Sequence, residues 1–270
     1  MNSQIITPHI DLQDFVKSFW VLESAKNHTP KRNTIVPDGC MKMIFHYGDA
    51  YRHHSAERSF LLPKSFIVGQ LTKPFEVKPT GETGTLLVCF YPNGLFPFAD
   101  FDFKKIENST VELSQVFGNE GETLALKVLN AITNTERIKI IEIFLRNRLT
   151  DFNTQNAIVK STIHSILKAD KQQSIAEISQ GNNINQRWLE RKFLSAVGLR
   201  PKQLTKIVRL QKTLKTLLNS RVTSLTALAH ENDYYDQSHF IKDFKEFTGF
   251  TPKEFDKEPL KMSLIFDKNN

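Results

Sequence analysis

The first hundred residues alternate short apolar stretches with proline and glycine. Stretches rich in aromatic and β-branched residues are typical of β-strands, and five of them lie at residues 15–22, 41–47, 65–69, 75–78 and 85–90. Turn signals such as Pro37-Asp38-Gly39 separate them. Short strands at this spacing predict a small β-barrel or β-sandwich.

From about residue 107 the apolar positions follow a helical period. Ile138, Ile141, Leu145 and Leu149 recur at helical spacing, which indicates a helix with one buried face. A further helix is predicted over residues 154–168. The polar stretch at 170–173 then favours a domain boundary between residues 150 and 172.

The next segment predicts a helix-turn-helix unit. Ser174 and Glu177 have the spacing of a capping box at the start of a short helix that ends near Gly181. Asn185 is placed to cap a second helix over residues 186–197, and Phe193 lies on its apolar stripe. The first turns of such a second helix are the part that enters a major groove. Their outward positions are Gln186, Arg187, Glu190 and Arg191.

A second unit repeats this design about fifty residues later. Ser224 can cap a short helix, and Asp236 can cap a longer one that buries Phe244 on its apolar side. Thr251 and Glu254 form another capping box. Side chains that both donate and accept hydrogen bonds, beside a cation, suit the reading of base edges. Here they are Gln237, Ser238, His239 and Lys242. We interpret Phe193 and Phe244 as core residues, not as base-stacking residues.

A single helix joins the two units. The helix is predicted over residues 201–218, with Pro201 at its start, and it carries one apolar stripe. Eighteen residues at about 1.5 Å each make a rod of roughly 27 Å, while successive major grooves on one side of DNA lie roughly 34 Å apart. The pattern therefore predicts a bipartite DNA reader, with Lys202 and Lys206 contacting phosphates.

These motifs are similar to those of a known family. Three pieces carry the likeness: Leu189-x-Arg191-x-Phe193-x4-Gly198-x2-Pro201, then Arg209-Leu210, then Asp236-Gln237-Ser238-His239-Phe240-x3-Phe244-Lys245-x3-Gly249-x2-Pro252-x2-Phe255. They resemble the DNA-binding domain of AraC/XylS-family transcriptional regulators, over residues 157–257. The resemblance implies that the outward positions given above meet DNA. The family's turn glycine is replaced by Asn183 and Asp233, residue types that tolerate a left-handed backbone.

The first 150 residues resemble, more weakly, the N-terminal module of some AraC-like regulators. The segments Val36-Pro37-Asp38-Gly39 and Val68-Gly69-Gln70-Leu71-Thr72-Lys73-Pro74 carry this resemblance. It implies a cupin-like barrel that senses a small molecule or supports dimerisation. The cupin metal pattern is missing, and we interpret His46, His53 and His54 as loop histidines. We therefore expect no metal and no cofactor.

Together these patterns predict an α+β chain with an N-terminal cupin-like β-barrel, then helices, then an all-α domain of two helix-turn-helix units. The expected parts are a sensor or dimerisation domain at 1–105, a helical connector at 106–170, the DNA-binding domain at 171–258 and a tail at 259–270.

Charge agrees with this division. Residues 1–150 carry a net charge of +1 and residues 151–270 a net charge of +6. Nine basic residues and Glu190 alone among acids lie within 187–215, which favours a polyanion as partner over an ordinary solvated face. Cys40 and Cys89 lie among apolar residues and are interpreted as buried thiols. Without a signal peptide or an apolar run that could span a bilayer, a cytoplasmic protein is expected.

Other functions fit the chain less well. No GxSxG, P-loop or GxGxxG motif is present, so an enzyme built on the N-terminal barrel is the weaker alternative. A DNA-bending architectural protein would need only cations on its binding face. Glu190 stays open between accepting from a cytosine amino group and pairing with Arg187 or Arg191. Double-stranded DNA is the expected partner, and the resemblance allows RNA polymerase, a small-molecule effector and a second copy of the chain. The effector-binding residues, the operator and the sign of regulation are not encoded in any recognisable motif.

Overall fold

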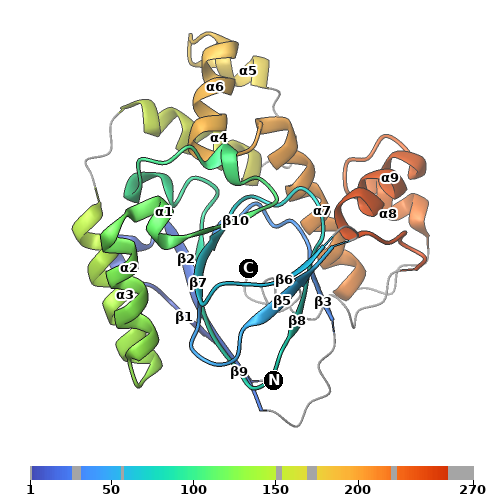
Figure 1. Cartoon of the computed structure of the whole chain (residues 1–270). Helices are drawn as coiled ribbons and strands as arrows, with labels where there is room; N and C mark the ends of the chain where they lie inside the picture. Colours follow the sequence, from blue (N-terminus) through green and yellow to red (C-terminus); the bar gives the residue numbers. More distant parts are fainter. Residues whose placement is uncertain are drawn as a thin grey trace.

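The computed structural model describes residues 2–25, 32–55, 58–149, 154–168, 175–219 and 224–254. A β-rich module occupies the first part of the chain, and helices make up the rest (Figure 1). Within the described part, no helix is both long and apolar enough to cross a membrane. Ser174 and the tail at 259–270 lie outside the described residues.

The β-module consists of two antiparallel sheets. One sheet has six strands in the order β1-β2-β9-β4-β7-β10, and the other has four in the order β3-β8-β5-β6. The strands are β1 (Asn2–Ile6), β2 (Val16–Ser24), β3 (Asn33–Ile35), β4 (Lys42–His46), β5 (Tyr51–His54), β6 (Ser59–Leu61), β7 (Ser65–Val68), β8 (Phe75–Pro79), β9 (Thr83–Phe90) and β10 (Thr110–Glu112).

The five predicted strands are confirmed as β2, β4, β7, β8 and β9. The prediction of a β-rich module is confirmed as well, but its closure is not: no strand pairing joins the two sheets in the described part of the chain. Edge strands β3 and β6 of the smaller sheet each pair with a strand of that same sheet. The module is therefore an open pair of facing sheets.

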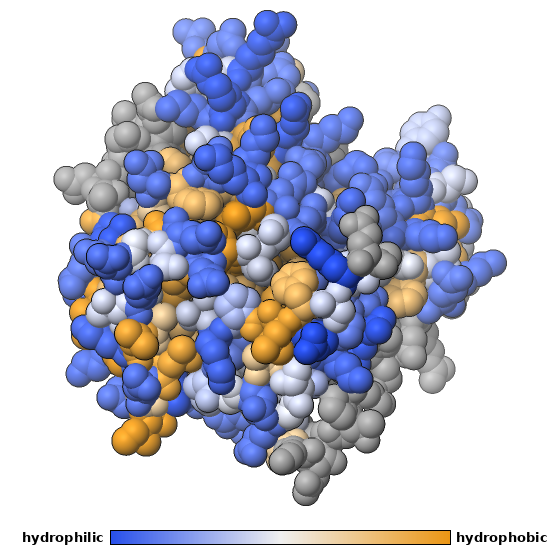
Figure 2. Space-filling model, in the orientation of Figure 1, coloured by the Kyte–Doolittle hydropathy of each residue, from blue (hydrophilic) through white to orange (hydrophobic). Residues whose placement is uncertain are grey.

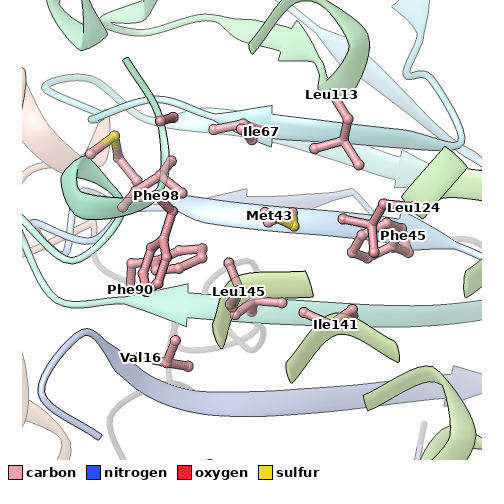
Figure 3. Packing of buried hydrophobic residues seen from close by; sticks show 14 of the residues in the cluster. Val16, Met43, Phe45, Ile67, Phe90, Phe98, Leu113, Leu124, Ile141 and Leu145 are labelled. Carbon is pink, nitrogen blue, oxygen red and sulfur yellow. The ribbon is translucent and has the colours of Figure 1, made fainter. Parts of the chain in front are cut away.

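The six-stranded sheet is buried on both faces. Met43 and Phe45 of β4 pack against Leu124, Ile141 and Leu145, which come from two helices that cover this side (Figure 3). The intervening Ile44 packs with residues of the four-stranded sheet. Because side chains alternate between faces along a strand, this double coverage explains why β4 and β9 are buried at every position.

The α-helices are α1 (Leu113–Phe117), α2 (Asn119–Asn130), α3 (Asn134–Arg148), α4 (Thr154–Lys168), α5 (Ile175–Gly181), α6 (Gln186–Val197), α7 (Pro201–Asn219), α8 (Leu225–Glu231) and α9 (Gln237–Thr248). Three 3-10 helices are η1 (Ile10–Leu12), η2 (Phe96–Phe98) and η3 (Phe103–Ile106). The predicted stripe on α3 is buried at Ile138, Ile141 and Leu145, whereas Leu149 follows the helix and is 36% exposed.

The C-terminal helices share a separate core. Phe193 and Phe244 are both fully buried in it, so their interpretation as core residues is confirmed. Ile207, Leu210 and Leu214 of α7 contribute the stripe that holds the two helix-turn-helix units together. Helix α4 joins the same core.

Candidate nucleic-acid interface

The two candidate reading helices, α6 and α9, begin and end alike. Asn185 Oδ1 accepts from Trp188 N at 3.1 Å, and Asp236 Oδ1 accepts from His239 N at 2.7 Å. Each helix ends at a glycine in the left-handed conformation, Gly198 and Gly249. The predicted caps of α6 and α9 are therefore confirmed, and Ser224 caps α8 as expected. The Thr251–Glu254 capping box is also formed.

The turns before these helices have the expected backbone. Asn183 and Asp233 have φ angles of 51° and 59°, so both adopt the left-handed conformation predicted for them. The turn between α8 and α9 is one residue longer than the turn between α5 and α6. Tyr235 lies in that longer turn and is 87% exposed.

The outer face of α6 is polar and carries two arginines and one glutamate. Gln186, Arg187 and Arg191 are exposed, and Glu190 is half-buried. Glu190 Oε1 accepts from Gln186 Nε2 at 3.0 Å, and no ion pair joins Glu190 to either arginine among the described residues. The ion-pair alternative for Glu190 is thus not the arrangement found. Figure 2 shows that the surface over α5 and α6 is almost entirely hydrophilic.

The outer face of α9 differs between its centre and its flanks. Ser238 and Lys242 are exposed, whereas Gln237 and His239 are half-buried. Gln237 Oε1 accepts from Thr226 Oγ1 at 2.9 Å. The two central side chains, Ser238 and Lys242, are therefore open to solvent. Gln237 already has a partner in Thr226, and the His239 ring contacts Tyr234.

Trp188 and Lys245 are two further candidate contacts that the sequence reasoning did not include. Trp188 follows the Asn185 cap by three residues, as His239 follows the Asp236 cap, so aligning the caps would have identified it. It is half-buried, with Lys192 Nζ 6.0 Å from its ring centroid. Lys245 is exposed on α9, one turn beyond Lys242.

The two lysines assigned to phosphate differ in their surroundings. Lys202 is exposed at the start of α7. Lys206 is half-buried, and its Nζ lies 2.9 Å from Asp243 Oδ1 and 3.9 Å from Glu246 Oε2. The charge of Lys206 is therefore largely neutralised within the protein, while that of Lys202 faces solvent.

The β-module touches this reader at three places. Gln211 Nε2 of α7 donates to Pro37 O, and a Cβ placed on Gly39 would meet Leu204 and Ile207 of the same helix. At the end of α6, Gly198 lies against Phe103 O and Gln70, and at the end of α9, Gly249 lies against Pro74. The segment at residues 69–74 thus contacts the C-terminal ends of both α6 and α9.

A small cavity lies between the two sheets of the β-module. Its volume is about 40 Å³, and it is lined mainly by apolar side chains with Lys42, His46 and Tyr51 among them. The interpretation of His46, His53 and His54 as loop histidines was wrong, because His46 lies on β4 and the other two lie on β5. His46 Nδ1 lies 3.0 Å from Thr85 Oγ1, and its buried Nε2 has no partner among the described residues. Burial, reinforced by nearby Lys64, lowers the pKa of His46 to about 4. Lys42 is held by Asp38, at 2.7 Å.

Leu71 connects this cavity to the reader. It lines the cavity, and its chain neighbour Gln70 packs against Gly198. Gln70 is fully buried and donates to Gly39 O at 3.0 Å. One short segment therefore faces the cavity on one side and the reading helices on the other.

Two parts of the chain match known families. Residues 170–258 match a family described as a helix-turn-helix domain, and residues 4–112 match a domain of unknown function, DUF6597. No curated protein matches the chain.

Solved structures give distant likenesses. The structure of ToxT from Vibrio cholerae is 12% identical, with 87% of this chain and 96% of that chain covered and a TM-score of 0.44. A DNA-binding transcriptional dual regulator from Escherichia coli K-12 is 21% identical, with 40% of this chain and 94% of that chain covered and a TM-score of 0.31.

Proposed function

We propose how this chain, a DNA-binding transcription regulator with an AraC-type helix-turn-helix domain at residues 170–258, reads its operator. Helices α6 and α9 enter successive major grooves on one side of the duplex, and α7 sets their separation. The observation that carries this proposal is the equivalence of the two helices, which share a capped start, a glycine end and a polar outer face. First turns of such helices are the part that reads bases.

On α6, Arg187 and Arg191 are the proposed guanine readers, because a guanidinium can donate two parallel hydrogen bonds to O6 and N7. Gln186 and Glu190 act as a pair: their hydrogen bond orients the carboxylate, which accepts from a cytosine amino group. Trp188 lies beside them as an apolar contact.

On α9, Ser238 and Lys242 are the proposed central contacts, with Gln237 and His239 at the flanks. Lys202 is the proposed phosphate contact at the start of α7. For Lys206 we replace the expected phosphate contact with a role inside the protein, because Asp243 already neutralises its charge.

Regulation by the N-terminal module is proposed to pass through residues 69–74. A small molecule that enlarged the cavity would displace Leu71 and hence Gln70, which packs at the end of α6. At about 40 Å³ the cavity has room for little more than a few waters, so an effector must open it. A thermal-shift screen of the full chain against small apolar compounds tests this, and stabilisation by none would argue against a ligand here.

Three further points rest on the resemblance. We propose RNA polymerase and a second copy of the chain as partners, which transcription in vitro and sedimentation of the full chain would test. We also propose the four-part division at 1–105, 106–170, 171–258 and 259–270, and limited proteolysis would test its boundaries.

The central experiment is selection of binding sequences from a randomised duplex pool with the full chain, followed by footprinting. We expect two protected segments about one helical turn apart, on one side of the DNA. The double variant Arg187→Ala with Arg191→Ala should lose its sequence preference in one protected segment and keep it in the other. A wild-type protein that selected no sequence over scrambled competitor at physiological salt would refute the proposal.

A further inference from the structure

A buried carboxylate on α9 is the starting point. Asp243 is 2% exposed, and a charge removed from water needs partners to offset its lost hydration. Its Oδ1 accepts from Lys206 Nζ of α7 at 2.9 Å. Its Oδ2 lies 3.5 Å from His239 Nε2 and has no hydrogen-bond partner among the described residues. One oxygen thus holds the linker helix, and the other faces a candidate DNA-reading side chain.

A second contact from α7 completes a network around His239. Arg209, three residues beyond Lys206, donates from Nη1 to Asp233 O at 2.9 Å. Its guanidinium lies 4.8 Å from the ring centroid of Tyr234, and that ring meets the His239 ring edge-on at 5.5 Å. Helix α7 therefore holds both the turn and the helix of the second unit with cations one turn apart.

The first unit has no counterpart. Aligned on the caps, α6 has Trp188 in place of His239 and Lys192 in place of Asp243. Lys192 lies over the Trp188 ring, so a cation and not a carboxylate occupies the position of Asp243 in the first unit. The acceptor beside His239 is a specific feature of α9, not a general requirement for building such a unit.

We propose that Asp243 is a positioning residue for DNA reading. Through Lys206 it fixes α9 on the linker helix, and through Oδ2 it accepts from His239 Nε2 when α9 enters the groove. An ionised carboxylate only accepts hydrogen bonds, so it fixes Nε2 as the protonated nitrogen. In that tautomer Nδ1 is the acceptor that faces the DNA, and it reads the amino group of adenine or cytosine. The inference rests on the proposed function, because it assigns His239 a base contact.

The test compares Asp243→Asn with wild type, each as the full chain, in selection from a randomised duplex pool. We expect the variant to lose about tenfold of its preference at one base pair of the second half-site, the usual size of one base-edge hydrogen-bond contact. The first half-site should be unchanged. His239→Ala should cause the same loss, and combining the two substitutions should add little to it. A purely structural role for Asp243 would instead change binding uniformly over both half-sites.

Glu246→Gln is the matched control. Its carboxylate also faces Lys206, at 3.9 Å, but its side chain is 50% exposed, so we expect no change in preference. Because Asp243 is buried, its substitution can also affect folding, and a second variant separates the two effects. Lys206→Met with Asp243→Leu replaces the ion pair by apolar side chains, an exchange that folded proteins tolerate. It should lose the same base-pair preference while its melting temperature stays close to that of the wild type.

Three outcomes are informative in different ways. Wild-type preference in Asp243→Asn or in the apolar double variant would overturn the inference. Additive losses from Asp243→Asn and His239→Ala would also overturn it, because residues that act through each other are not additive. Absence of any sequence preference in the wild type would instead refute the proposed function itself.

Discussion

Substituting Gly39 by alanine probes the contact between the β-module and the reader. Gly39 has a φ of 74°, and a Cβ there would lie 2.8 Å from Leu204 Cδ1 and 3.8 Å from Ile207 Cγ2. Leu204 is itself fully buried, so its side chain has little room to move away. The substitution therefore combines backbone strain with a clash against α7.

The two costs can be estimated separately. A left-handed backbone costs an alanine about 1–2 kcal/mol, and forcing an extra methyl group into a packed core costs about 1–3 kcal/mol. Gly39→Ala should therefore lower the free energy of unfolding by roughly 2–5 kcal/mol. Gly249→Ala is the matched control: its φ is 82°, but its Cβ would meet Pro74 only at an ordinary contact distance of 3.6 Å. Its free energy of unfolding should fall only by the cost of the backbone strain, about 1–2 kcal/mol.

Urea unfolding of the full-length variants measures both values, with fluorescence and circular dichroism compared to check that the transition is two-state. Hydrogen exchange in α7 should rise in Gly39→Ala and not in Gly249→Ala. If the two variants were destabilised equally, Gly39 would not pack against Leu204 in solution, and the contact between the β-module and α7 would lose its support.

Further predictions concern DNA binding and pH. Arg191→Ala should weaken binding to the selected sequence by about 1–3 kcal/mol with little effect on random DNA, and fluorescence anisotropy with both duplexes would show an equal loss if Arg191 contacted phosphate. Lys202→Gln should reduce the slope of log affinity against log salt concentration by about one. Lys206→Gln should leave this slope unchanged, because Asp243 neutralises the charge of Lys206. His46 has a pKa of about 4 in the folded chain against 6.5 ordinarily, so between these pH values the unfolded chain binds more protons than the folded chain. The free energy of unfolding should therefore fall by roughly 3 kcal/mol as the pH drops from about 6.5 to about 4. Urea unfolding across this range should show a smaller fall in His46→Phe, and an identical fall would assign the effect to other groups.

The sequence was most informative where structure depends on near neighbours. The bounds of α6 and its Asn185 cap were predicted to the residue, because capping joins groups only three positions apart. The left-handed turns at Asn183 and Asp233 were predicted for the same reason, since they depend on the residue type at one position.

Features that depend on distant partners were not predictable. Strand β2 lies between β1 and β9, and β10 comes from the stretch expected to be a helical connector, because strand neighbours are fixed by long-range packing. The fate of Lys206 depends on Asp243, 37 positions away. The positions of Lys202 and Lys206 along α7 therefore could not show which of the two lysines has its charge neutralised.

The segment at residues 69–74 has a consequence for engineering. Because it abuts the C-terminal ends of α6 and α9, its length affects how the β-module sits against both helices. A chimaera that grafts these two units onto a foreign sensor would need to transplant this segment as well. Lengthening it by a residue should loosen the contact of the sensor with α6 or α9 in the hybrid, even though no side chain proposed to contact bases has been altered.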